Sequence, residues 1–123
     1  MEPMQMKLKD IYQFFQNPPP TYLCQELAVC YILSVLLGGE SYGTELMQRL
    51  SIEYPPYRLS DTILDSALDF LEAENALVGY SKKVTGRGRP RRMYMVSSDW
   101  LLQATELAAF WHEYTKLTIK SKH

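Results

Sequence analysis

The chain has 123 residues, 46% of them hydrophobic and 22% charged, and this size and composition predict one globular domain with a single core. It contains no apolar run of 18 residues and no secretory signal pattern, so we expect a cytoplasmic protein with no membrane span. Its 13 basic and 14 acidic residues give a formal net charge of −1. The two cysteines and two histidines are too scattered for a metal cluster or a catalytic triad, so we expect no cofactor, no metal and no enzymatic activity.

The N-terminal part of the chain predicts three helices. Apolar residues at helical spacing predict a first helix over residues 4–16, which the prolines at 18–20 end. We expect Thr21 to cap a second helix that runs to Leu37 and is apolar around most of its surface, so that it lies centrally and mostly buried. Ser41 is expected to open a third, shorter helix that ends in a proline-containing loop.

A fourth predicted helix has the cleanest amphipathic pattern in the chain. Ser60 is a suitable N-cap, and Asn75 can adopt the left-handed backbone conformation that ends a helix. The apolar residues recur at helical spacing and are expected to face inward: Leu64, Ala67, Leu68 and Leu71. The outward face is polar and anionic, and it carries Thr62, Asp65, Ser66, Asp69 and Ala73.

Two strand-type runs, over residues 76–85 and 93–96, flank a tip of Gly, Arg and Pro and predict a β-hairpin. A long last helix is expected over residues 98–120. The order of helix, helix, short helix, helix, hairpin and helix predicts an α+β, mostly α, winged helix-turn-helix fold. We expect one domain over residues 1–123, with an N-terminal helix at 4–16, a winged-helix core at 21–97 and a dimerisation helix at 98–120.

The hairpin tip carries a basic segment, Lys82–Arg92, with six of the 13 basic residues and none of the 14 acidic ones. Because no acidic residue lies between Glu74 and Asp99, its arginines cannot all pair locally. Such a cationic spot predicts contact with double-stranded DNA. Either the cations grip phosphates, or the Gly-Arg-Gly-Arg-Pro run, which is similar to an AT-hook, enters a narrow minor groove.

We expect the DNA contacts to involve two sets of residues. The basic segment would grip the DNA through Arg87, Arg89, Arg91, Arg92, Lys82 and Lys83. Residues near the start of the fourth helix would approach base edges or backbone, namely Ser60, Thr62 and Ser66. The secondary phosphate contacts would be Tyr42, Thr44, Tyr57 and Arg58.

The last helix carries large apolar residues at alternating spacings of four and three. They predict a buried contact between two copies of the chain through Trp100, Ala104, Leu107, Trp111 and Tyr114. A cavity for a small effector between the two terminal helices is the alternative interpretation.

Three segments resemble the PadR-like winged-helix transcription regulators. Residues 36–46 (LLGGESYGTEL) are similar to the start of the family's helix-turn-helix, residues 59–77 (LSDTILDSALDFLEAENAL) to its recognition helix, and residues 86–97 (GRGRPRRMYMVS) to its wing. The resemblance implies a homodimeric DNA-binding repressor whose C-terminal helix pairs the subunits. As a dimer it would prefer an inverted repeat in promoter DNA with half-sites about 10 bp, or a multiple, apart.

The sequence departs from the family at the start of the recognition helix, where Asp61–Ser66 replaces the family's Pro-Gly-Thr-Leu-Tyr-Pro. Carboxylates repel phosphates, so this helix is a poor source of affinity. Either it sits shallowly on the DNA, or the wing supplies most of the binding. Two alternatives remain open: a winged-helix protein–protein adaptor that uses the acidic helix, and a repressor that responds to a small molecule bound between the terminal helices.

Overall fold

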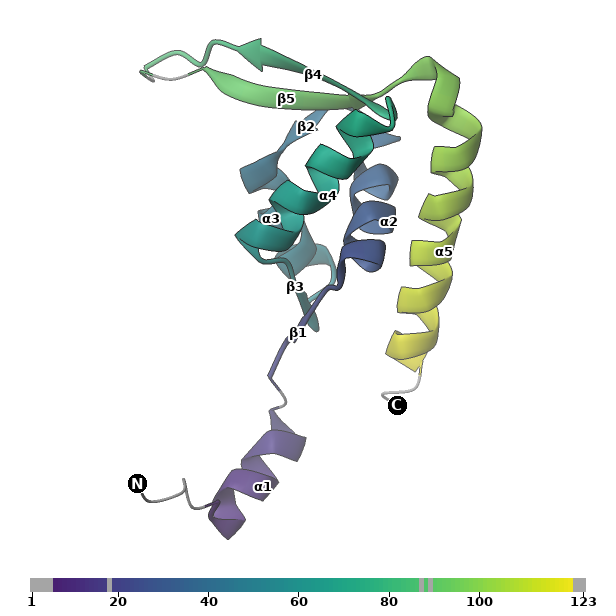
Figure 1. Cartoon of the computed structure of the whole chain (residues 1–123). Coiled ribbons are helices and arrows are strands. Elements are labelled where there is room, and N and C mark those ends of the chain that lie inside the picture. The colour runs from purple at the N-terminus through teal and green to yellow at the C-terminus, as the bar shows by residue number, and fades with distance from the viewer. Residues whose placement is uncertain (1–5, 18, 87, 89, 121–123) are drawn as a thin grey trace.

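The chain forms five α helices and five short strands in the part that the structure describes (Figure 1). The computed structural model describes residues 6–17, 19–86, 88 and 90–120. Its helices are α1 (Leu8–Gln16), α2 (Gln25–Leu36), α3 (Gly43–Glu53), α4 (Asp61–Ala73) and α5 (Leu101–Lys120), with a 3-10 turn at Ser98–Trp100 before α5. Its strands are β1 (Thr21–Tyr22), β2 (Ser41–Tyr42), β3 (Tyr57–Arg58), β4 (Leu77–Lys82) and β5 (Arg91–Val96). None of the described helices is long and apolar enough to cross a membrane.

Helix α2 lies at the centre of the core, between α4 and α5 (Figure 1). It buries residues around most of its circumference: Ala28, Val29, Tyr31, Ile32, Leu33, Val35 and Leu36. This confirms the central, mostly buried second helix that its apolar pattern predicts. By contrast, α1 buries no residue and stands apart from the body of the molecule.

The start of α2 differs from the prediction. Thr21 does not cap it, because Thr21 and Tyr22 form β1, which pairs in parallel with β3. The Thr21 amide donates to the Pro56 carbonyl at 2.7 Å, and Cys24 takes the N-cap position of α2. Pairing with a segment more than thirty residues away leaves no local sequence signal, so a capping pattern was the wrong interpretation.

Ser41 also has a different role from the predicted N-cap. Ser41 and Tyr42 form β2, which pairs antiparallel with Tyr94 and Met93 of β5, and α3 begins only at Gly43. Ser41 is fully buried, and its hydroxyl donates to Oε1 of Glu45 at 2.5 Å. The hairpin is thereby extended to a three-stranded sheet with the order β2-β5-β4.

The predicted boundaries of α4 are confirmed. Ser60 Oγ accepts a hydrogen bond from the Ile63 amide at 3.2 Å, and Asn75 has a φ of 62°, in the left-handed region. Its inward residues are all buried, as the amphipathic pattern predicts: Leu64, Ala67, Leu68 and Leu71.

The predicted hairpin is confirmed as β4 and β5, paired from Leu77 with Val96 to Lys82 with Arg91. We call residues 77–96 the wing. Gly86, at its tip, has a φ of 81°, a conformation that favours glycine. The wing lies across one end of the helices, and its tip projects beyond α3 and α4 on the side away from α5 (Figure 1).

Candidate nucleic-acid interface

The base of the wing and the helix-turn-helix border a polar groove of about 410 Å³. It is lined by Tyr42, Gly43, Thr44, Gln48, Asp65, Leu68, Pro90, Arg91, Arg92 and Tyr94. These residues come from β2 and α3, from α4, and from β5 with the proline before it, which are far apart in the sequence. The groove therefore brings together two arginines of the basic segment and the helix that the winged-helix fold presents to DNA.

Arg91 lies at the junction of the wing and α3. Its guanidinium carbon is 3.8 Å from the centroid of the Tyr42 ring, a cation–π contact. Arg91 is half-buried, so the contact orients its charged group on the sheet face instead of leaving the side chain free in solvent.

Two other cations of the basic segment have acidic partners within the chain. Arg92 Nη2 lies 3.1 Å from Glu72 Oε2 on α4, and Lys82 Nζ lies 3.6 Å from Glu40 Oε1. The Tyr80 hydroxyl donates to the other Glu40 oxygen, and this hydrogen bond raises the pKa of Tyr80. Both glutamates precede Glu74 in the sequence, outside the stretch where local pairing was excluded, and the fold brings them to the wing.

The remaining predicted wing cations are Lys83, Arg87 and Arg89. Lys83 is exposed. Arg87 and Arg89 lie outside the described residues, so their predicted contacts stay predictions.

The outward face of α4 is polar, as predicted. Thr62, Asp65 and Asp69 are exposed and Ser66 is half-buried, with Asp65 lining the groove. Ser60 is half-buried and its hydroxyl oxygen caps α4.

Of the predicted DNA contacts outside α4, Thr44 is accessible, whereas Arg58 and Tyr57 are engaged within the chain. Thr44 is exposed in the first turn of α3. Arg58 Nη1 donates to the carbonyls of Pro55 and Tyr57, both at 2.8 Å, and so braces the loop before β3. Tyr57 is only 2% exposed and has no surface to offer DNA in this conformation, because its ring belongs to the core.

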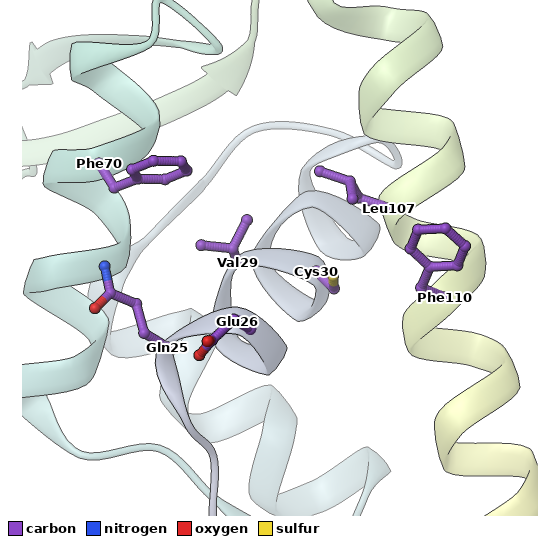
Figure 2. A pocket seen from close by; sticks show the side chains of 7 residues that line it. All are labelled: Gln25, Glu26, Val29, Cys30, Phe70, Leu107 and Phe110. Carbon is purple, nitrogen blue, oxygen red and sulfur yellow. The ribbon is translucent and has the colours of Figure 1, made fainter.

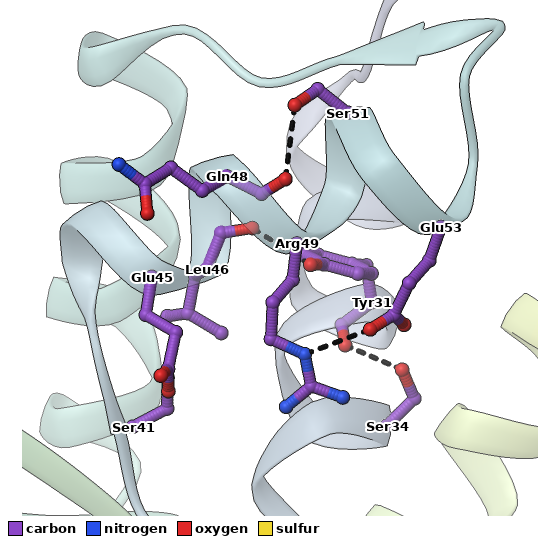
Figure 3. Close-up of polar contacts among 9 residues, drawn as sticks. All are labelled: Tyr31, Ser34, Ser41, Glu45, Leu46, Gln48, Arg49, Ser51 and Glu53. Atoms are coloured by element: carbon purple, nitrogen blue, oxygen red, sulfur yellow. Dashed lines mark hydrogen bonds and ion pairs between the residues drawn. The ribbon is translucent and has the colours of Figure 1, made fainter.

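Polar contacts brace α3 and join it to α2 (Figure 3). The buried Tyr31 hydroxyl donates to the Leu46 carbonyl at 2.7 Å and joins α2 to α3. Burial raises the pKa of Tyr31 well above its usual value, with a smaller contribution from Glu53. On the outer side of α3, Arg49 Nε lies 3.0 Å from Glu53 Oε2.

The residues predicted for a dimer contact on α5 do not share one exposed face. Ala104 and Trp111 are fully buried in the chain's own core, where Trp111 packs edge-on against Tyr31, Tyr54 and Tyr57 with ring centroids 5.1 to 5.7 Å apart. They have no surface for a second copy in this conformation. Trp100 and Leu107 are half-buried, and Tyr114 is exposed.

The exposed apolar surface of α5 borders a groove of about 540 Å³ between α2, α4 and α5 (Figure 2). Phe70 of α4 and Phe110 of α5 stand on opposite sides, with Val29 and Cys30 of α2 between them. Both phenylalanines are about half exposed, at 45% and 57%. The sequence prediction missed them, although apolar residues on the outward side of an amphipathic helix are a signal for such a surface.

Comparison with known proteins places this geometry in a family. No family model matches the chain, and no curated protein matches it. The crystal structure of the circadian clock associated protein Pex from Anabaena shares 64% sequence identity, covers 93% of this chain and 99% of its own, and superposes with a TM-score of 0.84. The chain belongs to the Pex family.

A second Pex structure, from Synechococcus sp., is 55% identical over 89% of this chain and 97% of its own, with a TM-score of 0.82. The sequence motifs and the extra N-terminal helix also resemble the period-extender protein of the cyanobacterial circadian clock, and the Pex matches confirm this recognition.

The PadR-like fold is confirmed as well. A PadR family transcription regulator from Clostridium difficile, 18% identical, covers 79% of this chain and 98% of its own with a TM-score of 0.58, which shows that this chain shares its fold. A PadR-like transcription factor from Bacteroides fragilis, 22% identical, covers 76% of this chain and also shares the fold, with a TM-score of 0.57. The chain thus belongs to the Pex family and has the fold of PadR regulators.

Proposed function

We propose that this protein is a sequence-specific, homodimeric transcriptional repressor that grips promoter DNA through its basic wing and represses a circadian clock gene. The observation that carries the proposal is the placement of Arg91 and Arg92, at the end of the basic segment, in the groove lined by α3, α4 and β5. A winged-helix protein needs its recognition helix and its wing on one face, so that both reach the same duplex.

The wing supplies most of the affinity in this proposal. The outward face of α4 carries exposed Asp65 and Asp69, which repel phosphates, whereas the basic segment has six cations. If each cation met one phosphate, a dimer would release on the order of ten counterions, and binding would weaken steeply with salt. Arginines at the tip would either grip phosphates or enter an A·T-rich minor groove, where the negative potential is enhanced.

Exposed apolar surface supports the homodimer. On α1, Leu8 and Phe15 are exposed at 67% and 76%, and on α5 Leu102 is exposed at 85%. These side chains, together with the groove between Phe70 and Phe110, expose more apolar surface than scattered single residues do on an ordinary monomer. Large exposed apolar surfaces mark interaction sites. Two copies joined there would read an inverted repeat with half-sites about 10 bp, or a multiple, apart.

The test is capture of genomic DNA fragments by the purified protein, followed by sequencing. The variant has Arg87, Arg89, Arg91 and Arg92 changed to Ala. A matched control removes four cations outside the wing, with Lys7, Lys9, Arg49 and Lys116 changed to Ala. Enrichment of a few promoters that share an inverted repeat, kept by the control and lost by the wing variant, supports the proposal.

No enrichment even at low salt would overturn the DNA-binding proposal and favour the adaptor interpretation, in which the acidic face of α4 meets a basic protein. Enrichment that survives in the wing variant would overturn the role of the wing alone. Transcription of an enriched clock promoter, with and without the protein, then tests the sign of regulation.

A small-molecule effector is a second proposal, and one observation favours it. The predicted site between the terminal helices is not formed, because α1 stands away from α5 (Figure 1). The groove between α2, α4 and α5 is apolar with Glu26 at its rim, a lining suited to an apolar cation (Figure 2). A screen of apolar amines with no thermal shift for the protein would contradict it.

A further inference from the structure

The guanidinium of Arg92 lies against residues of three elements, α4, β5 and β4. Its guanidinium Nη2 lies 3.1 Å from Glu72 Oε2 on α4, and its guanidinium carbon lies 5.9 Å from the centroid of the Tyr94 ring on β5. On β4, Gly79 lies beneath it. The side chain therefore joins both strands of the wing to the recognition helix.

Gly79 leaves space for the Arg92 guanidinium in this position. A Cβ built on Gly79 would lie 2.6 Å from Arg92 Nη2 and 2.9 Å from its guanidinium carbon, closer than side-chain atoms approach one another. The φ of Gly79 is not in the left-handed region, so its backbone does not require glycine. A side chain at position 79 would therefore force the Arg92 guanidinium to shift.

In this position Arg92 is poorly placed to bind a DNA phosphate. A phosphate close enough to pair with the Arg92 guanidinium in this position would also lie near the Glu72 carboxylate. The carboxylate would repel the phosphate. Arg92 would have to leave Glu72 and the surface of Gly79 to pair with a phosphate elsewhere. The charge of Arg92 is therefore already matched in the free protein, unlike a cation that only DNA can pair.

We propose that Arg92 is a positioning residue, which holds the wing at a set orientation to α4 through Glu72 and across Gly79, and that it does not itself grip phosphate. This inference rests on the proposed function, because the orientation matters when wing and α4 bind one duplex together. Its contribution is preorganisation: the wing is already placed when α4 meets the groove. Gripping then belongs to the other cations of the basic segment.

The experiment measures duplex affinity at several salt concentrations for Arg92→Ala, Gly79→Ala and Glu72→Gln, with the last two also made in the Arg92→Ala background. Gly79→Ala displaces the guanidinium without changing any charge. Arg49→Ala is the matched control, because Arg49 is also an exposed, ion-paired arginine but its partner Glu53 lies on the same helix.

Positioning predicts that Gly79→Ala lowers affinity about two- to fivefold when Arg92 is present and has little effect when it is absent. Glu72→Gln likewise lowers duplex affinity more when Arg92 is present than in the Arg92→Ala background. The slope of log affinity against log salt stays unchanged in Arg92→Ala. Phosphate gripping predicts the opposite: freeing Arg92 raises affinity, and Arg92→Ala lowers the steepness of the slope by about one per contact. Either of those results overturns the proposal.

Hydrogen exchange of the free protein gives a readout that does not depend on DNA. The amides of β4 and β5 should exchange faster in Arg92→Ala and Gly79→Ala than in Arg49→Ala, because the wing is released from α4. Unchanged exchange in both variants overturns the positioning role. If the wild-type protein binds no duplex but exchange changes as expected, the proposed function fails while the structural tie stands.

Discussion

The guanidinium of Arg91 stacks on the ring of Tyr42, 3.8 Å from its centroid, and links the first residue of β5 to the residue before α3. Tyr42 thus orients a cation of the basic segment toward the groove between wing and helix-turn-helix. Replacing Tyr42 with Leu removes the ring and should weaken DNA binding about two- to fivefold, whereas Tyr42→Phe keeps the ring and the affinity. Fluorescence anisotropy with a captured promoter fragment measures both. Equal losses in the two variants would contradict a role for the ring.

Lys83 is the described cation of the basic segment best placed to meet a phosphate, since it is exposed at the outer end of the wing. Lys83→Ala should weaken binding by a similar factor on every sequence and make the salt slope shallower by about one per phosphate contact. Lys116→Ala, an exposed cation on α5, is the control and should leave the slope unchanged. A loss confined to one sequence would instead indicate base contact.

Trp111 anchors α5 to the core, and its replacement should reduce stability. Trp111→Ala is expected to cost about 3–5 kcal/mol in the free energy of unfolding, because the side chain is fully buried among tyrosine rings. Trp111→Phe should cost less, since the indole Nε1 is buried without a hydrogen-bond partner among the described residues. Urea denaturation monitored by circular dichroism measures the difference. If Phe were as costly as Ala, an unseen partner of Nε1 would be indicated.

Ser60 stabilises the start of α4, the helix that carries the proposed DNA-facing side chains. Ser60→Ala removes the acceptor for the Ile63 amide and should cost about 1 kcal/mol of stability. Ser60→Asp keeps an acceptor and should restore most of it. The melting temperatures of the three proteins check this, and a Ser60→Asp protein no more stable than Ser60→Ala would show that capping is not the cause.

The buried hydroxyl of Tyr31 predicts a loss of stability at alkaline pH. Its pKa is raised in the folded state, so the protonated, hydrogen-bonding form is favoured by folding. Its contribution is therefore fully present below the unfolded pKa of about 10 and declines as the pH rises above it. Tyr31→Phe should cost about 1 kcal/mol at neutral pH and should make the decline above pH 10 shallower. Urea midpoints at pH 7 and at pH 10.5 test both effects, and an equally steep decline in Tyr31→Phe would assign it to the other tyrosines.

Local features of the sequence determined α4 and the wing. The cap at Ser60, the left-handed Asn75 and the inward leucines act within one or two turns of a helix, so the chain's own periodicity reveals them. The wing strands are long enough, at six residues each, to show their own pattern. The concentration of positive charge at the wing tip is likewise a property of composition, visible before any fold is known.

Only the tertiary structure decided which partners these segments meet. Strands β1 and β2 have two residues each and pair with distant segments, so they leave no periodicity to read. The spacing along α5 indicated an apolar stripe but could not tell whether Trp111 faces its own core or a second copy. The pairing of Arg92 with Glu72 likewise joins residues twenty positions apart. An apolar or charged side chain specifies only that it needs a partner, and the packing of the whole chain selects which one.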